Sequence, residues 1–383
     1  MVGQFGDLMN PEEVRNLYPL LAERAFLFSG GLAPASLRTK QAIERFTNEL
    51  TFETAERYKN LNEEYRIVQQ LFAGLIGADQ SEIVITDTTA AGSNLAVEMI
   101  ERSPGTNVVV DHFGYGSSIY PWKLPSRQHI ELRFVAPRAR TIHIDDLAAA
   151  VDNDTIAISV SHVSEMTGFR HDLETIGTLA ADYGAALLVD AMQSAGALQI
   201  DVHSAGVHFL SCGAMKWLLG SSGVGFFYCN EQYLQGLPPR AGITGFASQT
   251  VPWPERTLEP ETGADRLRLG APNLIGLAAT KPGLEILHET GMQTVERHVL
   301  DLSGYCIDQL QSRDLTVLTP TPEHLRAGIV AIELENASEV CSHMASRGVD
   351  GWSYGNMLRV DPHIFNNRGD IDRFLAALDE SSR

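Results

Sequence analysis

Two side chains, Asp190 and Lys216, have the types and positions needed for cofactor chemistry. Asp190 directly follows the apolar run Leu187-Leu-Val, and Lys216 lies between an apolar block and the glycine-rich segment 220–225. Apolar surroundings favour the neutral lysine amine, which attacks aldehydes. A carboxylate can hold a proton on a pyridine nitrogen, so the two residues together predict a pyridoxal phosphate (PLP) site. The alternatives are a surface lysine and an aspartate that caps a helix.

The charge of Asp190 alone can keep the nitrogen of such a ring protonated. At about 4 Å and an effective dielectric near 20, the ion pair is worth on the order of 4 kcal/mol. This equals roughly 3 pKa units, so the ring would stay protonated at neutral pH and withdraw electrons from a breaking bond. Gln193, three residues further on, is expected to bond the phenolic oxygen of the ring.

Thr88 and Thr89 open a predicted helix directly after a predicted strand. The first turn of a helix has free N–H groups and a positive dipole end, which together bind phosphate. We therefore expect Thr88 and Thr89 to hold the cofactor phosphate. The alternative is a simple threonine cap without a ligand.

The elements that must position these residues alternate between strands and helices. Apolar runs predict strands at 82–86, 107–111, 157–160, 186–189, 209–211 and 224–228, and helical spacing predicts helices at 36–46, 57–76, 88–101 and 173–183. This alternation is typical of an α/β fold with a mainly parallel sheet covered on both faces. Ligands of such sheets bind beyond the carboxyl ends of the strands, where Asp190 is expected.

The predicted organisation has three parts. Residues 1–24 form an N-terminal arm, 25–275 a large PLP-binding domain with a long irregular connection at 235–265, and 276–383 a small α+β domain. Residues 25–45 could also pack with the small domain. The small domain is expected to contain helices at 276–290, 293–310, 337–347 and 370–378, and strands at 316–318, 328–333 and 357–360.

Composition restricts the partners and the compartment. The 383 residues carry a formal net charge of −19, which disfavours nucleic acid and anionic membranes as partners. The N-terminus lacks a signal pattern, and no apolar run reaches the roughly 18 residues of a membrane helix. Four scattered cysteines form no C-x-x-C pair, so we expect a reducing cytoplasm. No histidine or cysteine spacing indicates a metal site.

Five motifs in order resemble the class V aminotransferases, the cysteine-desulfurase-like branch of the fold-type I PLP enzymes. Residues 207–216 with Gly223-Val-Gly225 are similar to the family's lysine signature, and Asp190-Ala-Met-Gln193 to its Asp-x-x-Gln. Segments 161–168, 268–273 and 359–366 are similar to three further motifs, and the match spans roughly residues 25–378.

The resemblance implies a fold, an assembly and further roles. It implies a fold-type I PLP enzyme acting on an amino acid, and a homodimer with its sites at the subunit interface. It places Tyr115 where the desulfurases have a histidine that stacks on the cofactor ring, and Arg359 as the clamp for the substrate α-carboxylate. A guanidinium suits that bidentate task. The alternatives are a core aromatic and a surface arginine.

The sequence departs from the family at the phosphate and ring contacts. The histidine before the lysine is Met215, the serine three positions before the lysine is Gly213, and the threonine that reaches the partner's phosphate is Ala271. Thr244 or Ser248 are candidates to replace these contacts. The asparagine near the ring oxygen is Glu165, which is expected either to be protonated or to turn toward the substrate, and so to tune the reaction.

Segment 349–359, where a desulfurase carries its catalytic cysteine, contains no cysteine. Persulfide formation is therefore not expected. The first prediction is a C–S lyase that cleaves a cysteine S-conjugate by β-elimination in small-molecule or secondary metabolism. The alternatives are an aminotransferase, an epimerase and a decarboxylating variant. A non-catalytic relative that binds the cofactor is the alternative from a different class.

Overall fold

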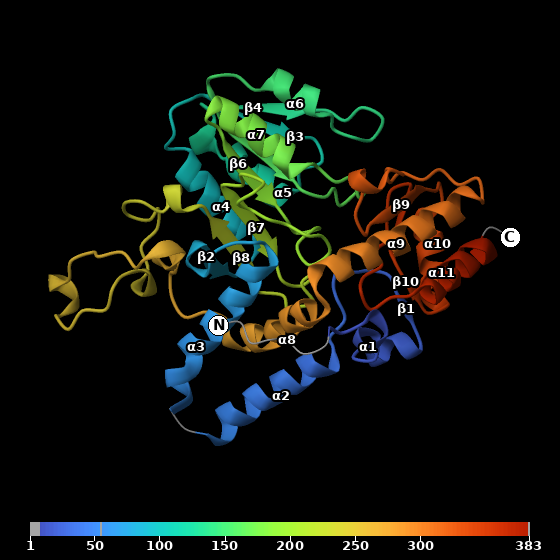
Figure 1. Cartoon of the computed structure of the whole chain (residues 1–383), viewed down its shortest axis with the longest axis horizontal. Helices are drawn as coiled ribbons and strands as arrows, with labels where there is room; N and C mark the ends of the chain where they lie inside the picture. The colour runs from blue at the N-terminus through green and yellow to red at the C-terminus, as the bar shows by residue number, and fades with distance from the viewer. Residues whose placement is uncertain (1–7, 54–55, 382–383) are drawn as a thin grey trace.

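A mainly parallel sheet forms the centre of the computed structural model, which describes residues 8–53 and 56–381 (Figure 1). In this described part, the strand order is β2 (Ile83–Thr86), β8 (Gly225–Cys229), β7 (Phe209–Gly213), β6 (Ala186–Asp190), β5 (Thr155–Ser161), β3 (Asn107–Asp111), β4 (Glu131–Val135). β8 runs antiparallel to both of its neighbours, and the remaining pairs are parallel. The large, mainly parallel sheet predicted from the sequence is confirmed.

Both faces of this sheet are covered, which explains the continuous apolar runs of its strands. On one face, side chains such as Ile158 and Leu187 share a core with α3 (Glu56–Leu75), α7 (Leu173–Tyr183) and α8 (Leu274–Thr290). On the other face, Leu188 and Phe209 pack with α4 (Thr89–Ile100). Successive strand residues alternate between the faces, so Asp190, like Leu188, lies on the α4 face.

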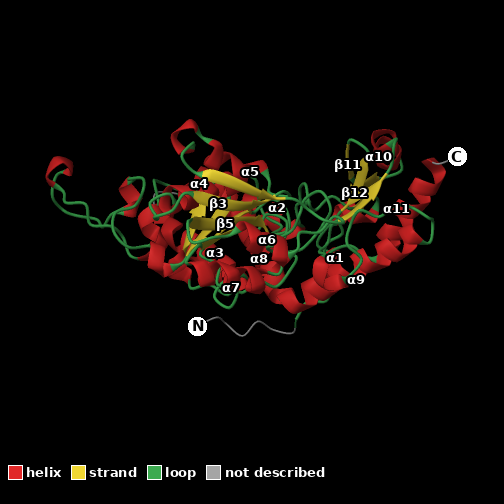
Figure 2. Cartoon of the chain, turned by 90° about the horizontal axis from the view of Figure 1, so that it is seen from above, coloured by secondary structure: helices red, strands yellow, loops and turns green. Residues whose placement is uncertain are grey.

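A second, smaller unit carries the C-terminal part of the chain (Figure 2). Its antiparallel sheet has the order β11 (Trp352–Tyr354), β12 (Met357–Val360), β9 (Val330–Glu333). This sheet shares a core with α9 (Met292–Gln311), α10 (Ala337–Ser346) and α11 (Arg368–Ser381). The short strand β1 (Ala25–Phe26) pairs with β10 (Val349–Asp350), so the N-terminal segment is joined to this unit.

The N-terminal helices connect the two units. In α1 (Pro11–Arg15), Arg15 pairs with the buried Asp370 of α11 at 2.7 Å. The longer α2 (Leu37–Phe52) packs along α8. The domain division at residue 275 stays a prediction; in packing terms, α8 and the first turns of α9 share the core of the large sheet.

Several elements differ from the sequence expectations. β4, α6 (Ile144–Ala150), α5 (Gly116–Ile119), β10 and β11 carried no sequence signal, because each is short and β4 lacks an apolar run. The predicted strand at 316–318 is wrong, since only Val317 forms an isolated bridge, to Ile332. Segment 235–265 contains short 3₁₀ turns and an isolated bridge between Phe246 and Pro260, and it extends away from the body (Figure 1). No helix in the described ranges is long and apolar enough to span a membrane.

Candidate active site

The carboxyl ends of β5, β6 and β7 bring the first group of predicted residues together. Asp190 is the last residue of β6 and is paired in register with Ser161 of β5 and Ser211 of β7. Lys216 follows the end of β7 by three residues. The acid and the lysine therefore meet at the edge of the sheet where ligands of this fold bind.

Asp190 is a buried carboxylate held by two neutral donors. Its Oδ1 accepts a 2.9 Å hydrogen bond from the Met192 N–H, and its Oδ2 accepts a 3.1 Å bond from the Ser117 hydroxyl. Burial raises the pKa of Asp190, and these two hydrogen bonds and the charge of Lys216 oppose that rise. A buried charge in such surroundings is stabilised by a cationic partner, and a protonated ring nitrogen meets that requirement.

Lys216 is partly buried, and burial lowers the pKa of its amine. The charges of Glu165, Asp190 and Asp361 act in the opposite direction, while Arg359 lowers the pKa further. Four of the predicted or neighbouring charged groups thus lie close enough to Lys216 to influence its proton. A neutral amine at this position can attack an aldehyde and later accept a proton.

Gln193 is buried, and two hydrogen bonds set the orientation of its amide. Its Oε1 accepts a 2.8 Å hydrogen bond from the indole N–H of Trp217, and its Nε2 donates to the Gly30 oxygen at 3.0 Å. A primary amide has two donor hydrogens, so one remains after the bond to Gly30. Its contact with the phenolic ring oxygen stays a prediction.

The start of α4 lies against the end of β7. Thr88 caps the helix, since its hydroxyl accepts a 3.1 Å bond from the Ala91 N–H, as the ligand-free interpretation expects. The Thr89 hydroxyl donates to the Met192 sulfur at 3.4 Å. Helix geometry leaves the main-chain N–H groups of the first turn without acceptors in their own helix. Phosphate binding at this turn stays a prediction for both threonines.

Two glycines, Gly213 and Gly225, allow the neighbouring segments to approach closely near the start of α4. A Cβ at Gly213 would lie 3.0 Å from the Met192 sulfur and 3.3 Å from the Thr89 hydroxyl. A Cβ at Gly225 would lie 2.9 Å from the Thr86 hydroxyl. The close helix N-terminus, the buried Asp190 and the partly buried Lys216 together fit the phosphate, the ring nitrogen and the aldehyde of PLP.

Tyr115 precedes α5 in a turn that lies over Asp190. Its main-chain N–H lies 3.4 Å from the Ser161 hydroxyl, and Ser117, in the first turn of α5, donates to Asp190. The Tyr115 ring is 54% exposed and lines a surface pocket with Ala90. Tyr115 is therefore not part of the core, and its stacking role stays a prediction.

Arg359 reaches the site from β12 of the small unit. Its Nη1 donates to the Glu165 main-chain oxygen at 2.6 Å, and its Nε lies 3.0 Å from the Asp361 carboxylate. The guanidinium carbon lies 4.5 Å from the centre of the Trp352 ring. The side chain is only 3% exposed, so Arg359 is not a surface arginine. Its orientation is thus held on three sides while Nη2 lies near Gly30.

Glu165 belongs to the turn between β5 and α7 and lies close to both Asp190 and Lys216. Its charge raises the pKa of each. Ser164 holds this turn, since its hydroxyl accepts from the Met166 and Thr167 N–H groups at 3.3 and 3.2 Å. The contact of Glu165 with the substrate stays a prediction, as does its role in tuning the reaction.

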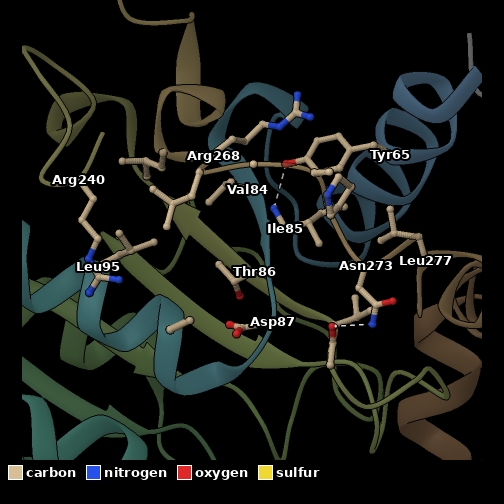
Figure 3. Close-up of a pocket in the computed structure, with 18 residues that line it drawn as sticks. Tyr65, Val84, Ile85, Thr86, Asp87, Leu95, Arg240, Arg268, Asn273 and Leu277 are labelled. Carbon is tan, nitrogen blue, oxygen red and sulfur yellow. Dashed lines mark hydrogen bonds between the residues drawn. The ribbon is translucent and has the colours of Figure 1, made fainter. Parts of the chain in front are cut away.

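One of the altered phosphate contacts, Ala271, lines a second cavity. A cavity of about 380 Å³ is lined by Thr86 and Asp87 beside the start of α4 and by segment 268–273, which includes Ala271 (Figure 3). The Thr244 hydroxyl lies 3.4 Å from the Gly270 oxygen, close to Ala271. The Met215 sulfur accepts from Ser222 at 3.3 Å. Thr244 stays a candidate for the missing contact, as does Ser248.

Sequence reasoning missed three residues that contact the site. Ser117 binds Asp190, Asp361 pairs with Arg359, and Trp352 stacks on the Arg359 guanidinium. The pairing of Asp361 with Arg359 could have been predicted from the sequence, because the two residues are two positions apart and residues i and i+2 of a strand share a face. Ser117 and Trp352 had none, since α5 and β11 were not predicted.

Known proteins match this chain over most of its length. The family model described as aminotransferase class-V matches residues 26–349. The uncharacterized aminotransferase YcbU of Bacillus subtilis is 25% identical over 94% of this chain and 95% of its own length. A probable cysteine desulfurase of Methanothermobacter thermautotrophicus is 26% identical over 86% of this chain and 82% of its own length.

Solved structures share the fold. The apo cysteine desulfurase from Thermococcus onnurineus NA1 superposes with a TM-score of 0.87 at 21% identity, covering 98% of this chain and 99% of that one. The cystine C–S lyase C-DES, in complex with its product cysteine persulfide, has a TM-score of 0.85 at 18% identity, covering 94% and 98%. Another C-DES structure carries the PLP cofactor. The chain therefore belongs to the class V aminotransferase family and is a PLP-dependent enzyme.

Proposed function

We propose that this enzyme is a C–S lyase that cleaves a cysteine S-conjugate, with one molecule of water, into a thiol, pyruvate and ammonia. The observation that carries the proposal is the combination of a complete set of Lys216, Asp190 and Arg359 with cysteines that lie elsewhere. Cys212, Cys229 and Cys306 are buried. Cys341, on α10, forms a hydrogen bond with Ser353. Ser353 lies on the face of the β11–β12 hairpin that is opposite to Arg359.

The position of these cysteines argues against a persulfide route. Such a route needs an accessible thiolate that reaches the substrate sulfur. Burial raises the pKa of the Cys212 thiol, and Asp190 raises it further, so this nearby cysteine stays protonated. Elimination needs no protein thiol, because the substrate sulfur leaves with the bond electrons. C-DES, which shares the fold, is a cystine C–S lyase. The fold therefore accommodates this chemistry.

Bound PLP supplies an electron sink for the bonds at the substrate Cα. In the proposal, Asp190 holds the proton on the ring nitrogen, and the Nη2 side of Arg359 holds the substrate α-carboxylate. The amine of Lys216, whose pKa is lowered by burial, removes the Cα proton and can return it to the leaving group. Tyr115 covers the ring, and Glu165 adjusts the protonation of Lys216.

The proposal includes the assembly and the compartment. Segment 235–275 exposes large apolar side chains, among them Ile243 (59%), Trp253 (63%) and Leu258 (61%), which supports a second copy of the chain as the partner. In this homodimer, the segment extends toward the site of the other subunit. The four cysteines are unpaired, which supports a cytoplasmic location. The net charge of −19 supports small-molecule substrates rather than nucleic acid.

Product analysis tests the reaction. The purified protein with PLP is incubated with S-methylcysteine or S-benzylcysteine, and thiol and pyruvate are assayed separately. The lyase yields both in equal amounts, and Lys216→Ala yields neither. A second candidate is amino transfer, favoured by the aminotransferase YcbU among the relatives. Its signature is a 2-oxo acid that keeps the C–S bond, and this result would exclude the lyase.

The visible spectrum tests the proposed role of Lys216. If Lys216 binds PLP, the protein is yellow and Lys216→Ala loses the band. A protein that stays colourless after incubation with PLP, or a band that Lys216→Ala keeps, would overturn this role.

A further inference from the structure

The β11–β12 hairpin presents an aromatic pair beside Arg359, the proposed carboxylate clamp. Trp352 and Tyr354 are stacked, with ring centres 5.8 Å apart and planes 9° apart. Arg359 lies over the Trp352 ring at 4.5 Å. The order guanidinium, indole, phenol therefore runs outward from the buried Arg359 to Tyr354, which is 65% exposed.

Strand register places all three side chains on one face of the hairpin. Trp352 pairs directly with Arg359, and Tyr354 pairs with Met357. Opposed residues of antiparallel strands share a face, and so do residues i and i+2. The other face belongs to the small core, where Leu358 and Val360 are buried and Ser353 bonds Cys341 of α10. Tyr354 therefore lies on the face that carries the proposed clamp. Figure 2 shows the hairpin beside α10.

The hairpin is tight and anchored. Only Gly355 and Asn356 separate the paired Tyr354 and Met357, and Gly355 has a φ of +54°, which a two-residue turn requires. The Asn356 oxygen accepts a 2.8 Å bond from the Leu334 N–H at the end of β9. The hairpin backbone that carries Tyr354 is thus fixed by the pairing of its two strands and by a hydrogen bond at its turn. Such a support suits a specificity wall, because a preorganised contact costs little entropy on binding.

We propose that Tyr354, stacked on Trp352, selects amino acids with an aromatic group on the side chain, such as S-benzyl or S-aryl cysteines. The proposal rests on the proposed function only for the clamp at Arg359, which orients the amino acid. With the carboxylate on Arg359, a side chain directed along the hairpin reaches the exposed Tyr354 ring. An aromatic group there gains stacking and apolar burial, whereas a methyl group does not reach it. Trp352 acts through Arg359 and is a positioning residue.

Binding of ligands that cannot lose a Cα proton tests this selection without the elimination step. The probes are α-methylphenylalanine and 2-aminoisobutyrate, which lack the Cα hydrogen, and their dissociation constants for the PLP-loaded enzyme are measured by calorimetry. The aromatic probe should bind roughly tenfold tighter. In Tyr354→Ala, the ratio of the two constants should fall about fivefold, while Tyr354→Phe should keep it. Trp352→Leu should weaken both probes, because Arg359 loses its support.

The matched control is Tyr183→Ala, which removes a 40% exposed ring from the end of α7. It should leave both constants unchanged. A ratio near one in the unaltered enzyme, or a ratio that Tyr354→Ala does not change, would overturn the proposal. An aromatic preference without thiol release would leave the selection intact and refute the lyase, so the two failures are distinguishable.

Discussion

The Nη1 of Arg359 donates a 2.6 Å hydrogen bond to the main-chain oxygen of Glu165. This bond joins β12 of the small unit to the turn after β5 of the large sheet, although the residues are 194 positions apart. The contact brings the proposed substrate clamp into the same site as Lys216 and Asp190. It also makes the orientation of the small unit a determinant of substrate binding.

Arg359→Lys should weaken amino-acid binding about 100-fold. An ammonium cannot bond the Glu165 oxygen, the Asp361 carboxylate and a substrate carboxylate in one plane. The dissociation constant of 2-aminoisobutyrate for the PLP-loaded enzyme checks this. Arg347→Lys is the matched control, because Arg347 pairs with Glu380 at the surface. Unchanged binding in Arg359→Lys would rule out the clamp.

Asp190→Asn should lower kcat about 1000-fold, because a neutral amide loses the roughly 4 kcal/mol that keeps the ring protonated. Steady-state kinetics and the position of the visible band report this change. Ser117→Ala removes only one 3.1 Å hydrogen bond to Asp190 and should cost less than about tenfold. Equal losses in both variants would contradict a role of the Asp190 charge.

Glu165→Gln should speed PLP incorporation into the cofactor-free protein on the acidic side of the profile. Burial lowers the pKa of Lys216, and the Glu165 charge opposes that effect. Removing the charge therefore lowers the pKa further, so more of the amine is neutral at a given pH. The measurement is the rate at which the visible band appears, followed as a function of pH from about pH 6 to about pH 10. A shift of the profile to higher pH would contradict the assignment.

His363 should make the fold sensitive to mild acid. Burial lowers the pKa of His363 to about 4, although its bond to the Trp217 oxygen opposes this. In the unfolded chain this histidine has a pKa of about 6.5 and therefore binds a proton more readily than in the folded protein. Its contribution to the free energy of unfolding is fully present above pH 6.5 and decreases as the pH falls toward 4. Urea unfolding measures how much the free energy of unfolding decreases between pH 7.5 and pH 5.0. This decrease should be about 2 kcal/mol smaller in His363→Gln than in the unaltered protein. An identical difference in the two proteins would refute this.

Arg15→Ala should lower the free energy of unfolding by about 2 to 3 kcal/mol, because it leaves the buried Asp370 carboxylate without its cation. The figure is reduced from that of a fully buried pair, since Arg15 remains 22% exposed. Lys40→Ala is the control, because its pair with Glu44 is exposed on both sides and should contribute less than about 0.5 kcal/mol. Denaturant unfolding compares the two variants.

The sequence alone determined the features that depend on neighbouring residues. It identified α7 with its boundaries at Leu173 and Tyr183, because apolar spacing is local and Gly184 adopts a φ of +67° that ends the helix. It also identified β3 and most of the central sheet, since strands buried on both faces are continuous apolar runs. The acid at the end of β6 and the lysine after β7 were found by the same local reasoning.

Only the tertiary structure decided which distant groups meet. The bonds from Ser117 to Asp190 and from Arg359 to Glu165 depend on strand order and on the packing of the small unit. Nothing in the residues near Arg359 indicated the hairpin that places Trp352 on its guanidinium, because β11 is a three-residue edge strand whose signal is too short to detect. Local propensities specify the elements, whereas contacts between them follow from how buried surfaces fit together, which no short stretch of sequence encodes.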